Sequence, residues 1–325
     1  MISKRKLIGS AFALAAVGFT GTSLAQPAFP NKMIKIVVGN AAGGTDDAIS
    51  RFVAEKISKE LGQPVVVDNR GGGATTIAGT YVSQAPADGY TLFCLINTAI
   101  NQTLLRDKLP YKLSSFVPVA GVGGFPLALA VSGTTPTKIT KVDELVAASR
   151  AKDGVTFASG GVGSMGHLNG VRFLNVVKGQ GVHVTYKNNP EGLNALMGGF
   201  TQMMFASVSE VAALRGDGKL RVLAVTAPQR SSNMPDVPTM QELGYPDFEV
   251  ALWHGFVAPA GTPPDVVAKL AGAISRAVKD PEFTARFKPL AFQEDLRTGK
   301  ELASFIDGSA ARWKKVIVDN KIQIE

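Results

Sequence analysis

The sequence predicts an α/β fold of two domains joined by two crossing segments. From Ile34 onward, hydrophobic strands alternate with helical segments, which is typical of α/β proteins with largely parallel sheets. Two glycine-rich turns, at 40–47 and 159–167, each follow a predicted strand and open a predicted helix, one in each half of the chain. We therefore expect the chain to begin in one domain, visit a second and return, with a hinge and a ligand cleft between them.

The first unit is predicted to contain three strands and two helices. A helix after the first strand has apolar residues at helical spacing, and Gly62 followed by Pro64 supplies its stop. The predicted strands are 34–38, 65–67 and 90–96, and the helices carry Ile49, Phe52, Val53, Ile57 and Leu61 and then 77–82.

A Pro- and Gly-rich segment at 116–126 then leads into an extended crossing at 127–131. Thr140 and Asp143 predict a capping box for the next helix. Later strands are predicted at 155–158, 183–186, 203–206, 220–226 and 250–257, and helical stripes contain Leu168, Val171 and Leu174, then Leu270, Ile274 and Val278, then Phe305, Ile306, Trp313 and Ile317. The predicted division is a signal peptide at 1–25, one domain at 26–124 plus 249–325, and a second domain at 125–248.

The N-terminal residues predict export. Lys4, Arg5 and Lys6 precede an apolar stretch at 7–19, and small residues end at Ala25, as in a cleavable signal peptide. The stretch is shorter than the roughly 20 residues of a membrane span. No cysteine lies near Ala25, so we expect no lipid anchor.

Charge and cysteine content exclude several classes of function. The formal net charge is +8, with three of the basic residues in the signal peptide, and no basic run interleaved with aromatics follows, so we expect no nucleic-acid partner. Cys94, the only cysteine, lies in an apolar strand and is expected to be a small buried residue rather than a nucleophile.

The first glycine-rich turn suits an anion, because it points backbone N–H groups and the positive end of a helix at whatever lies above it. Gly43 and Gly44 allow close approach to a ligand, or simply form a tight turn. Thr45 offers a hydroxyl. Asp46 or Asp47 would repel an anion unless turned away, and Asp47 is expected to shape the helix start.

The second turn supplies Ser159, Gly163 and Ser164 as an opposing clamp. Ser164 has an alternative role as a helix N-cap whose hydroxyl is used locally. His167 either faces the cleft or is hydrogen-bonded within the structure.

Polar residues also follow two further strands. Asn97, Thr98 and Asn101 come after the strand that ends at Ile96, where α/β sheets place ligand groups. Ser207 occupies the corresponding edge of the second domain. Trp253 either lines the cleft or is buried in its strand.

Catalytic and cofactor chemistry is not supported. The turn at 161–166 fits the dinucleotide pattern G-x-G-x-x-G, but 186–189 offers no acid for the ribose. Val162 replaces the first glycine of a serine-hydrolase elbow. His167, His183 and His254 lack metal-ligand spacing, and no P-loop lysine is present. We expect no catalytic residue, no cofactor and no metal.

Ordered motifs along the mature chain resemble the Bug-type receptors, the periplasmic substrate-binding proteins of tripartite tricarboxylate transporters. The matching segments are 29–30, 34–38, 41–47, 50–51, 67–70, 87–92, 158–164, 167–168, 184–187, 218–226, 235–239 and 258–263. Two departures are Asn40, where an aromatic is common, and 71–75, which replaces the usual Pro-Gly-Ala-Gly-Gly.

The resemblance implies a type II periplasmic-binding-protein fold, a Venus flytrap with an interdomain cleft. Such a receptor captures a small carboxylate, held by loop backbone groups and waters at the two turns, and presents it to integral membrane permease subunits. We expect a periplasmic monomer that is not an enzyme, or alternatively a ligand sensor for a histidine kinase. The predicted ligand-binding residues are Asn40, Ala42, Gly43, Gly44, Thr45, Asn97, Thr98, Asn101, Ser159, Gly160, Gly163, Ser164, His167 and Ser207.

Overall fold

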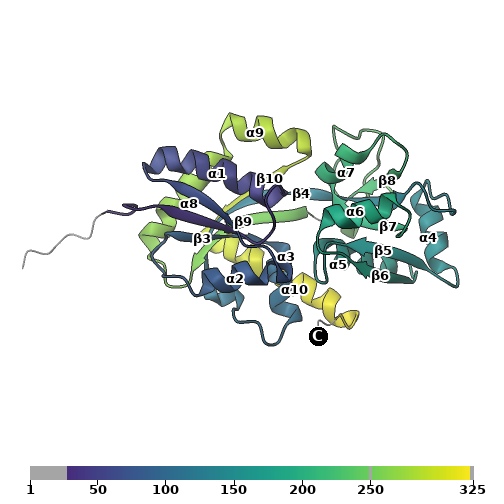
Figure 1. The fold of residues 1–325 in the computed structure, drawn as a ribbon, viewed down its shortest axis with the longest axis horizontal. Helices are drawn as coiled ribbons and strands as arrows, with labels where there is room; N and C mark the ends of the chain where they lie inside the picture. Colours follow the sequence, from purple (N-terminus) through teal and green to yellow (C-terminus); the bar gives the residue numbers. More distant parts are fainter. Residues whose placement is uncertain (1–27, 249–250, 323–325) are drawn as a thin grey trace, which may run out of the picture.

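The computed structural model describes residues 28–248 and 251–322 (Figure 1). The expected signal peptide at 1–25 lies outside this part of the chain. None of the helices described combines the length and apolar character that a membrane span requires.

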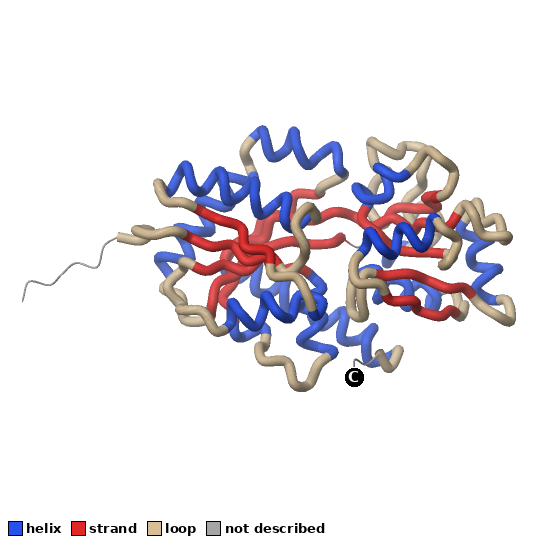
Figure 2. The backbone as a smooth tube through the Cα atoms, in the orientation of Figure 1, coloured by secondary structure: helices blue, strands red, loops and turns tan. Residues whose placement is uncertain are grey.

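The described strands form one continuous, curled sheet in the order β2-β1-β3-β9-β4-β7-β5-β6, and β10 and β8 also pair with β4. Figure 2 shows the strands inside the molecule with helices outside them. Their bounds are β1 Ile34–Val38, β2 Val65–Asn69, β3 Thr91–Ile96, β4 Phe116–Ser132, β5 Val155–Ser159, β6 Gly181–Thr185, β7 Met203–Ser207, β8 Leu220–Val225, β9 Ala251–Pro259 and β10 Gln293–Thr298.

The helices cover the sheet on both faces. Their bounds are α1 Thr45–Leu61, α2 Thr76–Ser83, α3 Asn97–Leu105, α4 Val142–Arg150, α5 Met165–Val176, α6 Asn189–Met197, α7 Val208–Leu214, α8 Pro264–Val278, α9 Pro281–Phe287 and α10 Gly299–Asp319. The sequence predicted the strands from β1 to β9, with β4 only in part, but not α3, α6, α7, α9 or β10.

Strand β4 divides the molecule into two lobes. Its first part, 116–126, pairs with β9 and β10, and its second part, 127–132, pairs with β7 and β8. We call the elements around β1, β2, β3, β9 and β10 the first lobe, and those around β5, β6, β7 and β8 the second lobe. The two lobes lie side by side in Figure 1.

The expectation of a largely parallel sheet is wrong at its centre. The pairs β1–β2, β1–β3, β5–β6 and β5–β7 are parallel, whereas every pairing of β4, and that of β3 with β9, is antiparallel. Segment 116–126, predicted only as a Pro- and Gly-rich lead into the crossing at 127–131, is strand. Its glycines permit bulges and close pairing, since a Cβ on Gly124 would lie 2.6 Å from the Leu252 carbonyl oxygen.

Two helix ends can be compared with the stop and capping signals predicted from the sequence. Gly62 ends α1 in the left-handed conformation, with φ at 67°, as predicted. The capping box of α4 uses Glu144 rather than Asp143, because the helix starts one residue later than predicted and Lys141 is its N-cap. The Glu144 carboxylate accepts the Thr140 and Lys141 N–H groups at 2.6 and 3.3 Å.

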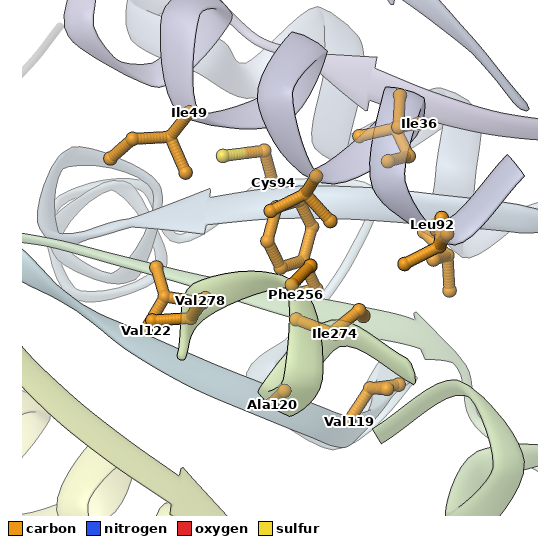
Figure 3. Packing of buried hydrophobic residues seen from close by; sticks show 14 of the residues in the cluster. Ile36, Ile49, Leu92, Cys94, Val119, Ala120, Val122, Phe256, Ile274 and Val278 are labelled. Atoms are coloured by element: carbon orange, nitrogen blue, oxygen red, sulfur yellow. The ribbon is translucent and has the colours of Figure 1, made fainter. Parts of the chain in front are cut away.

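Each lobe has apolar packing on both faces of its part of the sheet. In the first lobe, β1, β3, β4 and β9 pack against α1 and α8, and Cys94 is a buried member of this cluster, as expected (Figure 3). In the second lobe, one cluster also contains Leu105 of α3 and Trp313 and Ile317 of α10. Leu302 and Ile306, earlier in α10, pack in the first lobe, so this helix contacts both cores.

Candidate ligand-binding site

The first glycine-rich turn joins β1 to α1 and is held mostly by its own residues, with one further hydrogen bond from Asn69 Nδ2 of β2 to the Asn40 carbonyl at 3.2 Å. The Gly43 N–H donates to Asp47 Oδ2 at 2.9 Å, and Arg51 pairs with the Asp47 carboxylate at 2.9 Å. Asn40 Nδ2 donates to Asp46 Oδ2 at 2.8 Å. Asp47 therefore shapes the turn, as predicted, and its charge is directed at Arg51 rather than outward.

The two neighbouring aspartates differ in their electrostatics. Burial raises the pKa of Asp46, although the hydrogen bond from Asn40 opposes this. Burial also acts to raise the pKa of Asp47, but hydrogen bonds from Arg51 and the Gly43 N–H outweigh it and lower the pKa. The charged form of Asp46 is thus disfavoured where an anion is expected, and that of Asp47 is stabilised.

Part of the first turn faces open space. No atom lies within 4 Å of a Cβ built on Gly43, whose φ is 91°. Within the described residues, the amide N–H groups of Ala42 and Thr45 have no acceptor, and Gly44 caps α1 without a side-chain hydrogen bond. The Thr45 hydroxyl lies 3.5 Å from His254 Nε2.

The second turn, between β5 and α5, is held by internal hydrogen bonds. Ser159 Oγ donates to the Gly161 carbonyl at 3.0 Å, and the Ser164 N–H donates to the same carbonyl at 3.2 Å. Ser164 is the N-cap of α5, accepting the His167 N–H at 3.3 Å. The local role considered for the Ser164 hydroxyl is therefore present.

A stack of aromatic rings lies beneath this turn. His167 and His183 stack with ring centroids 3.9 Å apart, and Phe157 stacks on both. The Gly163 N–H donates to His167 Nδ1 at 3.1 Å, and His183 Nε2 lies 2.7 Å from Ser159 Oγ. Burial lowers the pKa of His167 to about 3 and that of His183 to about 4. Both rings are neutral at pH 7, and His167 is hydrogen-bonded within the structure.

Helix α3 carries the predicted residues that follow β3 and contacts the second turn. Asn101 Nδ2 donates to the Gly163 carbonyl at 3.0 Å, and Gln102 Nε2 donates to the Val162 carbonyl at 3.1 Å. Asn97 Oδ1 instead accepts a hydrogen bond from the backbone N–H of Trp253 at 2.6 Å. Thr98, which follows Asn97 in the sequence, is 9% exposed.

At the edge of β7, Ser207 is fully buried and its hydroxyl lies 2.8 Å from Ser209 Oγ. Its N–H donates to Glu210 Oε2 at 3.0 Å. Burial raises the pKa of Glu210, and the charge of Asp46 from the first lobe adds to this effect. A Cβ on Gly160 would lie 2.6 Å from Asn189 Oδ1, so this glycine is packed closely against α6.

The structure thus brings Asn101 to the second turn and leaves Asn97 and Ser207 in internal hydrogen bonds. Trp253 is 3% exposed, and its ring lies tilted against that of Phe305 with centroids 4.9 Å apart, so it is a buried strand residue. Sequence reasoning missed Gln102 and Glu210, because α3 and α7 were not predicted. Asn and Thr at the start of α3 are weak helix formers, which masked its apolar spacing.

The part of the chain that the structure describes contains no cluster of three or more His, Cys, Asp or Glu side chains suited to a metal. A surface hollow of about 670 Å³ on the second lobe contains none of the predicted residues; its lining includes Thr134, Asn194, Met197, Arg215 and Lys219.

Comparison with known proteins agrees with the fold. The family model of the tripartite tricarboxylate transporter family receptor matches residues 49–322. The periplasmic binding protein BugD is 29% identical, with 91% of this chain and 100% of BugD covered and a TM-score of 0.81.

Two further solved structures contain ligands. MatC from Rhodopseudomonas palustris, with bound malate, is 29% identical, covers 89% of this chain and 100% of its own, and has a TM-score of 0.77. Rpa4515 from R. palustris, with adipate, is 28% identical, covers 91% and 99%, and has a TM-score of 0.83. The chain therefore belongs to the tripartite tricarboxylate transporter receptor family, whose members are solute-binding receptors with the two-domain periplasmic-binding-protein fold and not enzymes.

Proposed function

We propose that this protein binds a small carboxylic acid between its two lobes in the periplasm and presents it to integral membrane permease subunits of the tripartite tricarboxylate type. The observation that carries the proposal is the pair of turns. Each lies between a strand and a helix N-terminus, in a different lobe, and each contains a glycine, Gly43 or Gly161, with no atom within 4 Å of a built Cβ. Open backbone at a helix N-terminus is a favourable place for a carboxylate.

The contacts proposed for the ligand come from both turns. In the first turn, the amides of Ala42 and Thr45 have no acceptor within the described residues, and the Thr45 hydroxyl is a further donor. Asn40, Gly44 and Gly160 line the turns through their backbones, with bound waters filling the gaps. The raised pKa of Asp46 reduces the repulsion of an anion there.

The two relatives with malate and adipate support a carboxylate, since both ligands are dicarboxylic acids. We further propose that the moving bodies are 26–124 with 249–325 and 125–248, and that the receptor is a monomer. Closure of the lobes on the acid would form the surface that the permease recognises.

Thermal denaturation with malate, adipate and succinate tests the proposal, with the corresponding diamides as matched uncharged controls. An acid at a hundred times its dissociation constant should add about 2.7 kcal/mol to the free energy of unfolding, and its diamide should add nothing. Equal shifts from acid and diamide, or no shift from any acid, would contradict it.

A further inference from the structure

We propose that the Val162 N–H is the donor that the second turn presents to the acid, and that Gln102 and His167 are positioning residues that orient it. This inference rests on the proposed function and adds which atom acts and what holds it. The Val162 N–H has no acceptor within the described residues, whereas the N–H groups of Gly161, Gly163 and Ser164 all do.

The direction of this N–H follows from its peptide plane. In a trans peptide the C=O and N–H groups point in opposite directions. The Gly161 carbonyl of this plane points inward, where it accepts from Ser159 Oγ and the Ser164 N–H at 3.0 and 3.2 Å. The Val162 N–H must therefore point outward, away from Ser159.

The next peptide plane is held at both ends. Its Val162 carbonyl accepts from Gln102 Nε2 at 3.1 Å, and its Gly163 N–H donates to His167 Nδ1 at 3.1 Å. Arg106 Nε donates to Gln102 Oε1 at 3.0 Å, which directs the Gln102 amide nitrogen at the turn. The two planes share the Val162 Cα, so Gln102 and His167 hold one end of the plane that carries the Val162 N–H, and the bonds to the Gly161 carbonyl hold the other.

The space beside this donor is open. Gly161, with φ at 126°, has no atom within 4 Å of a built Cβ. Gly163 lies on the side of the turn that packs against α3, where a built Cβ would be 2.4 Å from Leu105 and 2.7 Å from Gln102. Asn101 Oδ1, from the side chain that binds the Gly163 carbonyl, is buried without a partner and is available to a bound water. The turn is thus packed against α3 on one side and open on the other.

Amide NMR of the full-length mature protein, titrated with malate, succinate and adipate, tests the assignment. We expect the Val162 signal to shift with the same dissociation constant that calorimetry gives, and the Gly163 and Ser164 signals to shift less. Binding by calorimetry with an unmoved Val162 signal would overturn this inference alone. Absence of binding by every acid would overturn the proposed function and this inference with it.

The positioning role is tested with Gln102→Met, which keeps the length of the side chain but removes its hydrogen bonds. Loss of one such bond should weaken binding of the acid about fivefold to tenfold and reduce the Val162 shift. Gln202→Met is the matched control, because Gln202 binds the Thr156 N–H at 2.8 Å in the second lobe, away from the turn; it should leave binding within about twofold.

If Gln102 had only a structural role, Gln102→Met would lower the melting temperature and leave the dissociation constant of the acid unchanged, and that result would overturn the positioning role. If Gln102→Met does not fold, Gln102→Glu replaces it, because Glu keeps the acceptor for Arg106 and lacks the donor for Val162. Wild-type affinity in Gln102→Glu would likewise overturn the role.

Discussion

The two glycine-rich turns differ in what holds them. The first is held mostly by nearby residues, Asp47 and Arg51 one helical turn apart, with one further hydrogen bond from Asn69 of β2 to the Asn40 carbonyl at 3.2 Å. The second depends on three elements, since α3, α5 and β6 all supply side chains that bind or stack on it. The same local sequence pattern can therefore be locally stabilised or assembled from distant parts of the chain.

The largest expected effect is on the free energy of unfolding, and it differs between the turns when a glycine of each is replaced by alanine. Gly163→Ala combines a φ of 80° with overlap at 2.4 Å against Leu105, and should destabilise the fold by about 3–4 kcal/mol. Gly43→Ala has a φ of 91° but open space, and should cost only about 1–2 kcal/mol. Urea denaturation of both variants measures the difference, and equal losses would contradict the role of α3 at the second turn.

The histidines of the second turn predict that acid lowers the stability of the protein. The pKa of His167 is about 3 in the folded state, below its usual value, so the unfolded chain binds more protons between about pH 6.5 and 3. Stability should fall as the pH falls through that window.

Between pH 7 and 4, we expect the free energy of unfolding of His167→Gln to fall by about 2–3 kcal/mol less than that of the wild type. This figure follows from about 1.4 kcal/mol per pKa unit, reduced to allow for solvent screening. Urea denaturation at both pH values measures this. The raised pKa values of Asp46 and Glu210 act in the opposite direction, but they are present in both proteins and cancel. Parallel pH profiles would exclude a buried neutral His167.

Within the first turn, the two aspartates should respond in opposite directions at pH 7. Asp47→Asn removes a stabilised charge and should cost about 1–2 kcal/mol, because the pKa of Asp47 is lowered. Asp46→Asn removes a charge that burial disfavours, so it should be neutral or stabilising. Thermal unfolding of the pair checks the sign, and destabilisation of equal size in both would show that their environments do not differ.

The smallest expected effect concerns α10, which contacts both lobes. Gly308 lies between Ile306 and Trp313 with no atom within 4 Å of a built Cβ. Gly308→Ala should stabilise the protein by about 0.5–1 kcal/mol through helix propensity. Gly272→Ala in α8, where a built Cβ would lie 3.3 Å from the Arg276 guanidinium, is the matched control and should give a similar gain. A loss at Gly308 alone would show that α10 is bent or strained there.

The sequence predicted the regular parts of this fold because their signals are local. β1, α1 and the glycine stop at Gly62 depend on spacing within a few residues. The antiparallel centre was not predicted, because the pairing of β4 with β9 joins segments more than a hundred residues apart and its Pro and Gly content is typical of a linker. The family resemblance supplied the periplasmic-binding-protein type of this α/β fold, which the local signals left open.

For the candidate site, too, the local features were predicted and the long-range contacts were not. The positions of both turns and the N-cap role of Ser164 followed from the sequence. Gln102 did not, because only the folded chain places α3 against Val162. The ligand contacts themselves stay a prediction.

The placement of Trp313 and Ile317 has a consequence for the order in which the protein matures. These side chains complete the core of the second lobe, yet they are synthesised after every strand of that lobe. A chain that emerges from its N-terminus first must hold the second lobe with an unfilled apolar face until the last helix arrives. Exposed apolar surface of this kind is what chaperones bind, so the nascent protein depends on such protection longest in its middle third.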